Sequence, residues 1–245
     1  MRDFLLFRLY GPMASWGEVA VGETRPSAAH PSKSAILGLV AAALGIKRDK
    51  ENVLRSLADG YGFGVRVDAD GELLRDYHTA QVPPERRKIK YYTRRDELKS
   101  DDLYTILSSR DYRTDSCYSI ALWQRENSPF DLASIQAALL QPKLPLYLGR
   151  KSCPLGLPLR PELLNEETLK QAFDDYVFVD EAFGFPMAGL STERNYYWEH
   201  LDDTHAGMAS MMSQTRRDQL HNRQRWQFSE RDEFYFRESN KEVRV

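Results

Sequence analysis

Hydrophobic and polar positions alternate in several short runs of the chain, and each run predicts a β-strand. The first covers residues 4–10 and ends at a Gly-Pro pair. Residues 61–67 alternate in the same way, with glycines at two positions that leave one face bare. The same reasoning predicts strands over 117–123 and 146–148. An Asp-Gly turn after residue 69 predicts that 73–79 returns as the hairpin partner of 61–67.

Apolar residues with a helical period follow the first predicted strand. In residues 32–44, Leu37, Val40 and Leu44 recur at i, i+3 and i+7, with Ser32 as a candidate N-cap and Gly45 as a C′ residue. A weaker helical stretch covers 51–58. A further helix begins at Ser128-Pro129 and ends before a proline at 142.

The order of these elements predicts an α+β fold, with a ferredoxin-like (RRM/RAMP) βαββαβ palm over residues 1–160. A polar excursion without helical period, about 80–114, predicts an inserted thumb. Residues 161–245 predict a smaller C-terminal α+β portion. We expect a helix over 165–173, a strand over 176–180, a loop over 182–223, and a terminal β-hairpin from 225–229 and 232–237.

Composition narrows the possible functions. Hydrophobic residues make up 42% of the chain, enough for a globular core, while a net charge of −2 means that any nucleic-acid surface must be local. Two cysteines without CxxC spacing argue against a disulfide framework and a zinc site, and favour a reducing cytoplasm. Arg8 interrupts the first apolar run, so a signal peptide or membrane span is not expected there. Cofactor and metal motifs are absent from the sequence, and we expect neither group.

Basic residues gather at two loops. Arg25, Lys33 and Ser34 lie at or before the positive end of the helix 32–44, where N–H groups and cations suit a phosphate. Arg150 and Lys151 lie in a glycine- and proline-rich turn. The alternative for the first loop is an ordinary capped helix with solvated charges.

Residues 86–95 have the strongest local charge bias, with six cations, no acid and the pair Tyr91-Tyr92. Cations interleaved with aromatic rings suit nucleic acid, since the cations follow the backbone while rings stack on bases. A solvated basic loop is the alternative. Two histidines, His78 beside Tyr77 and His30 near Lys33, also leave open a metal-independent ribonuclease or purely structural roles.

Six motifs in order closely resemble the CasD family, the RAMP-type subunit of type I-E CRISPR Cascade complexes. They are GPMASWG (11–17), TRP (24–26), PSKSAILGLVAAALGI (31–46), RDYHT (75–79), RDYRTDSCYSIAL (110–122) and YLGRKSCPLGLP (147–158). The resemblance implies a non-catalytic antiviral subunit that grips the 5′ handle of the CRISPR RNA (crRNA) and caps the filament. It implies partners of the CasC backbone type and the CasA large-subunit type.

The resemblance also implies which residues contact RNA. The expected contacts are Arg25, Lys33, Ser34, His78, Arg110, Tyr147, Gly149, Arg150, Lys151 and Ser152. Two alternatives stay open. One is a metal-independent CRISPR repeat endoribonuclease, as in the sister type I-C branch, and the other is a purely structural protein cap.

Overall fold

The computed structural model describes residues 1–85, 89–177 and 193–239 of the 245-residue chain. Its elements are β1 (Arg2–Tyr10), β2 (Met13–Ala14), β3 (Thr24–Arg25), α1 (Lys33–Leu44), α2 (Glu51–Gly60), β4 (Tyr61–Ala69), β5 (Glu72–Val82), α3 (Arg94–Glu97), β6 (Tyr104–Thr114), β7 (Cys117–Gln124), α4 (Leu132–Leu140), β8 (Glu162–Glu166), α5 (Leu169–Asp175), β9 (Glu193–Trp198), α6 (Asp203–Ala206), β10 (Met212–Asn222) and β11 (Gln227–Ser239). The α+β class is confirmed.

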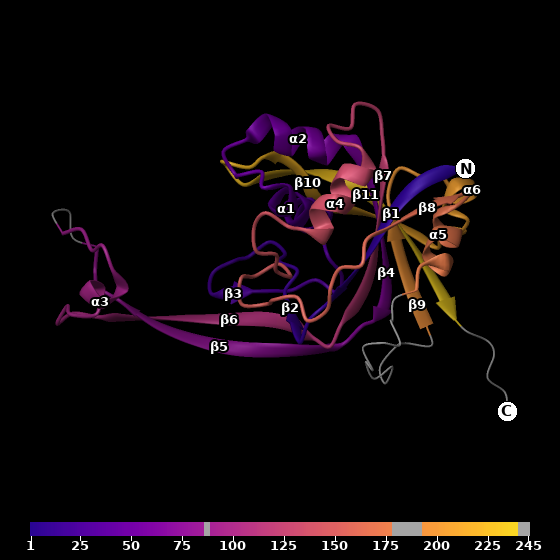
Figure 1. Ribbon diagram of the computed structural model, residues 1–245. Helices are drawn as coiled ribbons and strands as arrows, with labels where there is room; N and C mark the ends of the chain where they lie inside the picture. Colours follow the sequence, from indigo (N-terminus) through magenta and orange to yellow (C-terminus); the bar gives the residue numbers. More distant parts are fainter. Residues whose placement is uncertain (86–88, 178–192, 240–245) are drawn as a thin grey trace.

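A seven-stranded antiparallel sheet forms the body, in the order β10-β11-β9-β4-β7-β1-β8. Helices α1, α2 and α4 cover one face, and α5 and α6 lie on the other (Figure 1). Alternate residues of β1 contribute to the two hydrophobic cores, one on each face of the sheet. Leu5 and Phe7 pack toward α1, α2 and α4, and Phe4 and Leu6 pack toward α5. The middle strands therefore have two buried faces.

The glycines of β4 do not leave one face of the strand bare, contrary to the sequence prediction. All nine of its residues are buried. A Cβ added at Gly62 would lie 2.1 Å from the ring of Trp123, and Leu169 packs against Gly64. The glycines make room for a tryptophan from the neighbouring strand β7, so that face is filled by side chains from elsewhere.

A second sheet carries the long extension of the molecule. It has the order β2-β6-β3, and β5 pairs with β6 along its whole length. The two-stranded ribbon β5–β6 projects away from the body and has α3 near its far end (Figure 1). The ribbon begins at Glu72, before the predicted thumb of about 80–114, and the predicted region includes the end of β5, α3 and all of β6.

The predicted hairpin between 61–67 and 73–79 is wrong. Residues 72–82 pair with β6, because β4 already has β7 and β9 on its two edges and offers no free edge. The predicted strand at 146–148 is also wrong. That segment makes only an isolated bridge between Tyr147 and Pro154, and β8 takes the place beside β1.

The carboxyl-terminal half is more regular than its sequence indicates. Within the described part of 182–223, β9, α6 and β10 replace the predicted loop; β10 is mostly exposed and so lacks an apolar period. Apart from residues 225 and 226, both strands of the predicted hairpin belong to β11, which pairs with β10 on one edge and β9 on the other. The helix expected over 165–173 begins at Leu169, after β8. Most of the strand predicted at 176–180 lies outside the described residues, and Tyr176 and Val177 are not in a strand.

Candidate nucleic-acid interface

Two of the predicted RNA contacts are neighbours across a short parallel strand pair. Arg25 on β3 is the register partner of Arg110 on β6. The pair is extended by the N–H of Ser109, which donates to the carbonyl of Glu23 at 3.0 Å. The side chain of Arg25 is exposed, and its guanidinium donates to the carbonyls of Gly22 at 2.6 Å and Thr24 at 3.0 Å.

The glycine-containing loop after α4 is fastened beside this pair. The N–H of Leu148 donates to the carbonyl of Cys153 at 2.8 Å, which closes the loop. The N–H of Ser15 then donates to the carbonyl of Leu148 at 3.1 Å, and its hydroxyl donates to the carbonyl of Asp111 at 2.9 Å. Gly149 has a φ of 80°, and an added Cβ would lie 1.8 Å from the carbonyl oxygen of Ser15. Only glycine allows this close approach.

Arg150 joins the loop to the two strands. Its Nη2 donates to the carbonyl of Arg25 at 3.1 Å, and its guanidinium carbon lies 4.8 Å from the ring centre of Tyr112. Its buried Nη1 has no hydrogen-bond partner within the described residues. Three arginines from distant segments therefore meet at one surface, which we call the arginine surface: Arg25, Arg110 and Arg150.

Asp111, next to Arg110 in sequence, is already paired. Asp111 is buried and accepts two hydrogen bonds from the guanidinium of Arg75, at 2.8 and 3.0 Å. These bonds lower the pKa of Asp111, so it stays ionised and neutralises Arg75. Asp76 is the register partner of Arg110, and its Oδ2 lies 2.5 Å from Nε2 of His78. Because Asp111 is balanced by Arg75, it does not offset the charges of Arg25, Arg110 and Arg150.

The other predicted contacts of the loop flank this surface. Lys151 and Ser152 are exposed and follow Arg150 directly, while Tyr147 is half-buried at the start of the loop. His78 lies on β5, opposite Ser108, whose hydroxyl accepts from Nε of Arg110 at 3.2 Å.

Lys33 is the main correction to the predicted site. Its side chain is 1% exposed, and Nζ lies 2.6 Å from Oε1 of Glu199, which is equally buried. An ammonium in this position is held inside the protein and does not reach a phosphate on the surface. Ser34 is half-buried, with its hydroxyl 3.2 Å from that of Ser32, the N-cap of α1. The predicted N-cap and the C′ residue Gly45 are confirmed.

Lys33 belongs to a buried network of charges that the sequence reading missed. The N–H of Lys33 donates to Asp218 at 2.8 Å, and Arg231 binds Asp218 at 2.6 Å and Glu233 at 2.7 Å. Arg216 and His30 lie on the far side of Glu233, each 3.3 Å from its carboxylate. Three carboxylates balance three fixed cations, so the network fixes α1 to β9, β10 and β11.

The two candidate catalytic histidines have separate surroundings. His30 is buried, its ring stacks on Tyr197 at 3.8 Å, and burial lowers its pKa. His78 is on the ribbon and is paired with Asp76. Each ring has a structural partner of its own, which favours the structural role over a shared catalytic site.

Part of the basic stretch 86–95 lies outside the described residues, since 86–88 are not placed. In the described part, Nζ of Lys90 lies 5.2 Å from the ring centre of Tyr92, and Arg94 pairs with Glu97. A solvent-exposed cation and ring are therefore stacked near the far end of the ribbon.

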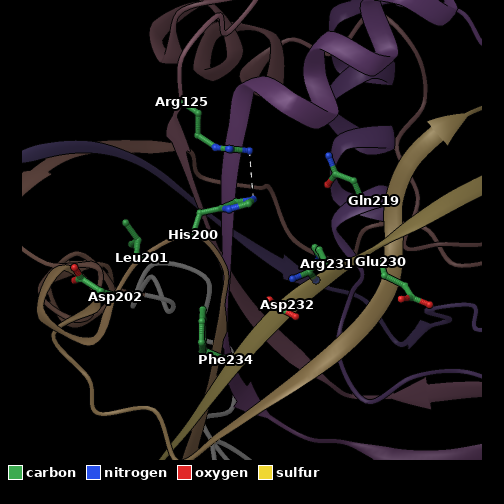
Figure 2. Close-up of a pocket in the computed structure, with 9 residues that line it drawn as sticks. All are labelled: Arg125, His200, Leu201, Asp202, Gln219, Glu230, Arg231, Asp232 and Phe234. Carbon is green, nitrogen blue, oxygen red and sulfur yellow. Dashed lines mark hydrogen bonds between the residues drawn. The ribbon is translucent and has the colours of Figure 1, made fainter.

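A hollow of about 600 Å³ opens beside the buried network (Figure 2). Arg125 donates to Nε2 of His200 at 3.3 Å, and burial, followed by the charge of Arg125, lowers the pKa of His200 to about 4. Three acids and three basic residues line the hollow, so its lining favours neither sign of ligand. The lining residues are Arg125, His200, Leu201, Asp202, Gln219, Glu230, Arg231, Asp232 and Phe234.

The described residues hold no group of three His, Cys, Asp or Glu side chains placed to bind a metal ion. Their helices are also too short or too polar to cross a membrane.

Comparisons with known proteins agree with the family resemblance. Residues 4–232 match the family described as "CRISPR-associated protein (Cas_Cas5)". The "CRISPR system Cascade subunit CasD" of Escherichia coli (strain K12) is 37% identical over 167 residues, which cover 65% of this chain and 70% of that protein. A solved chain from a "CRISPR RNA-guided surveillance complex" has a TM-score of 0.65 and 25% identity, covering 96% of this chain and 89% of that chain. A second, "Crystal structure of Cas protein", has a TM-score of 0.61 and 26% identity, covering 96% and 93%.

Proposed function

Because the chain belongs to the Cas5 family of CRISPR-associated proteins, we propose that it is a non-catalytic subunit of a type I-E Cascade surveillance complex. In this proposal it holds the 5′ handle of crRNA and caps one end of the backbone filament. The identity to CasD supports the assignment to the type I-E branch. Two free, buried cysteines suit the reducing cytoplasm in which we place this function.

The convergence of the arginine surface is the observation that carries the RNA-binding proposal. Arg25, Arg110 and Arg150 come from three motifs of the resemblance and are joined by a strand register and by a hydrogen bond. Guanidinium groups donate several hydrogen bonds in a plane and match phosphate oxygens. The exposed Lys151, next to Arg150, supplies a further cation for a single-stranded backbone.

The strand order supports a ferredoxin-like palm. Elements β1, α1, β4, β7, α4 and β8 follow each other along the chain as βαββαβ, and their strands lie in the order β4-β7-β1-β8. We propose these strands as the palm, with β8 as its fourth strand. Residues 161–245 then supply that strand and the smaller C-terminal portion, β9 to β11.

The ribbon suits contacts with other subunits. It projects from the body (Figure 1) and carries several large apolar side chains that are exposed to solvent. They include Leu73, Tyr77, Tyr104 and Ile106. Exposed apolar surface of this kind is typical of a contact with another protein. We propose that the ribbon contacts a CasC-type backbone subunit, and that the CasA-type large subunit binds elsewhere on the body.

The double variant Arg110→Ala with Arg150→Ala in the assembled complex tests the RNA site. We expect weaker retention of handle-bearing RNA, and a fall of about 1.4 in the slope of log K against log salt, since each single-strand phosphate contact contributes about 0.7. The control is Arg2→Ala with Arg55→Ala, which removes two exposed arginines from other places. Unchanged RNA occupancy in the test variant would contradict the site. Stable incorporation of the subunit into a complex without RNA would favour the structural cap.

A further inference from the structure

Trp226 differs from the other tryptophans of the chain in its exposure. It lies in the turn between β10 and β11 and is 61% exposed, with a φ of 53°. The other three, Trp16, Trp123 and Trp198, are at most 2% exposed, and all four lie within the described residues. A large ring kept in water at the tip of a hairpin is a candidate contact surface.

Two guanidinium groups accompany this ring. The guanidinium carbon of Arg223 lies 4.1 Å from the ring centre of Trp226, and that of Arg48 lies 5.9 Å away. Together with Asp49 and Gln224 they line a shallow hollow of about 300 Å³. Arg48 comes from the loop before α2, so the cluster is assembled from two segments far apart in the sequence.

The backbone of the turn is held in place by an acid. Glu51, in the first turn of α2, accepts the N–H of Arg223 at 2.7 Å and that of Gln224 at 3.3 Å. Within the turn, the N–H of Arg225 donates to Asn222 at 2.9 Å. These bonds use backbone donors, so the arginine side chains of the turn are not needed to hold it. Its position beside α2 is visible in Figure 1.

The charges of the cluster leave a site for an anion. Burial and then the charge of Arg48 lower the pKa of Arg223, while Tyr147 and Glu51 act in the opposite direction. Arginine nevertheless stays protonated in proteins, so two positive charges share one ring. The carboxylate of Glu51 is engaged by two backbone donors, and the remaining acid of the hollow is Asp49.

We propose that Trp226, Arg48 and Arg223 form a second contact for single-stranded nucleic acid, separate from the arginine surface. A base stacks on the exposed indole, and the guanidiniums bind the adjacent phosphates, as in stacking sites that tolerate any sequence. A protein hot spot has the same residue types but lies in an apolar surround. Here the two segments around the ring carry only charged or amide side chains, apart from the ring itself: Lys47, Arg48, Asp49, Lys50 and Glu51 in one, and Asn222, Arg223, Gln224, Arg225 and Gln227 in the other.

Intrinsic fluorescence tests this proposal on the full chain, because the exposed indole reports on stacking while the other three are buried. Titration with oligo(rU) and oligo(dT) at low salt is expected to quench the red-shifted emission to saturation. Trp226→Phe should abolish the quenching. Arg48→Ala with Arg223→Ala should weaken the apparent affinity about tenfold or more, and Arg225→Ala, from the same turn, should change it less than threefold.

The result is distinguishable from failure of the arginine surface. The Arg110→Ala, Arg150→Ala variant should retain the quenching of Trp226 by the oligonucleotides, whether or not it loses handle-bearing RNA in the assembled complex. Absence of saturable quenching, or quenching that persists in Trp226→Phe, would overturn the proposal. So would a Trp226→Ala variant that loses a protein subunit from the complex while binding the oligonucleotides as well as the unmodified chain, since the turn would then be a protein contact.

Discussion

Nζ of Lys33 and Oε1 of Glu199 lie 2.6 Å apart, and both side chains are fully buried although one begins α1 and the other follows β9. Burial lowers the pKa of Lys33 and raises that of Glu199, and each shift is opposed by the charge of the partner. The pair has a structural role, because each buried charge is stabilised by the opposite charge of its partner.

Lys33→Ala should therefore act on stability. Removing one member leaves Glu199 buried with less compensation, and we expect the free energy of unfolding to fall by about 3–5 kcal/mol in urea titrations. Lys33→Met combined with Glu199→Gln should lose much less, because neither residue is then charged. Ser34→Ala serves as a control at the next position. A soluble Lys33→Ala protein of normal stability that loses RNA would contradict this structural role.

The hollow beside the network predicts a pH dependence of stability. Burial lowers the pKa of His200 from 6.5 to about 4, so the unfolded chain binds more protons than the folded one between these values. Stability should fall as pH drops from 6.5 to 4, by about 1–2 kcal/mol for this residue after allowing for its solvent exposure. Burial of His30 acts in the same direction.

His200→Asn isolates this contribution. Asparagine tolerates the positive φ of 57° at this position, and the variant should show a smaller loss of stability over the same pH range. Urea unfolding of both proteins at several pH values measures the difference. Parallel stability curves for the two proteins would show that the pKa of His200 is not lowered in the folded state.

Gly149 should be intolerant of a methyl group. Because an added Cβ would lie 1.8 Å from the carbonyl of Ser15, Gly149→Ala must displace the loop that carries Arg150. We expect a stability loss of about 1–3 kcal/mol, typical of strain at a special backbone position, together with weaker RNA retention. The matched control is Gly38→Ala in α1, where the added Cβ meets nothing within 4 Å; it should stabilise the protein by up to about 1 kcal/mol. Equal effects of the two substitutions would contradict the packing of Gly149.

The ribonuclease alternative makes a different prediction. Incubation of the purified protein with CRISPR repeat RNA in EDTA should leave the RNA intact, because His30 is buried in the charge network and His78 is paired with Asp76 on the ribbon. Denaturing gel electrophoresis provides the measurement. Cleavage at a fixed position that is lost in His78→Ala or His30→Ala would instead establish an enzyme.

Local signals predicted the first half of the fold well. The cap at Ser32, the C′ glycine and the alternation in β1, β4 and β7 act over short distances, and the structure confirms those elements. Strand pairing is not local. A β4–β5 hairpin looked natural from the Asp-Gly turn, but the edges of β4 are occupied by strands from distant parts of the chain.

The candidate site shows the same limit. Arg25 and Arg150 were predicted from basic loops and Arg110 from motif resemblance, but the closeness of Arg25 and Arg110 depends on a parallel pair two residues long, which no periodicity reveals. Lys33 was misjudged because its neighbours in sequence are polar, whereas its neighbours in space are Glu199 and Asp218. Trp226 was missed because a lone aromatic residue in a charged segment carries no periodic signal.

The N–H of Lys33 binds a carboxylate that lies 185 residues further along the chain. At a synthesis rate of about 5–20 residues per second, Lys33 is synthesised roughly 10–40 seconds before Asp218. During that interval the first turn of α1 must keep an ammonium in water that the finished protein buries. The contacts that bury Lys33 can therefore form only after β9, β10 and β11 have been synthesised.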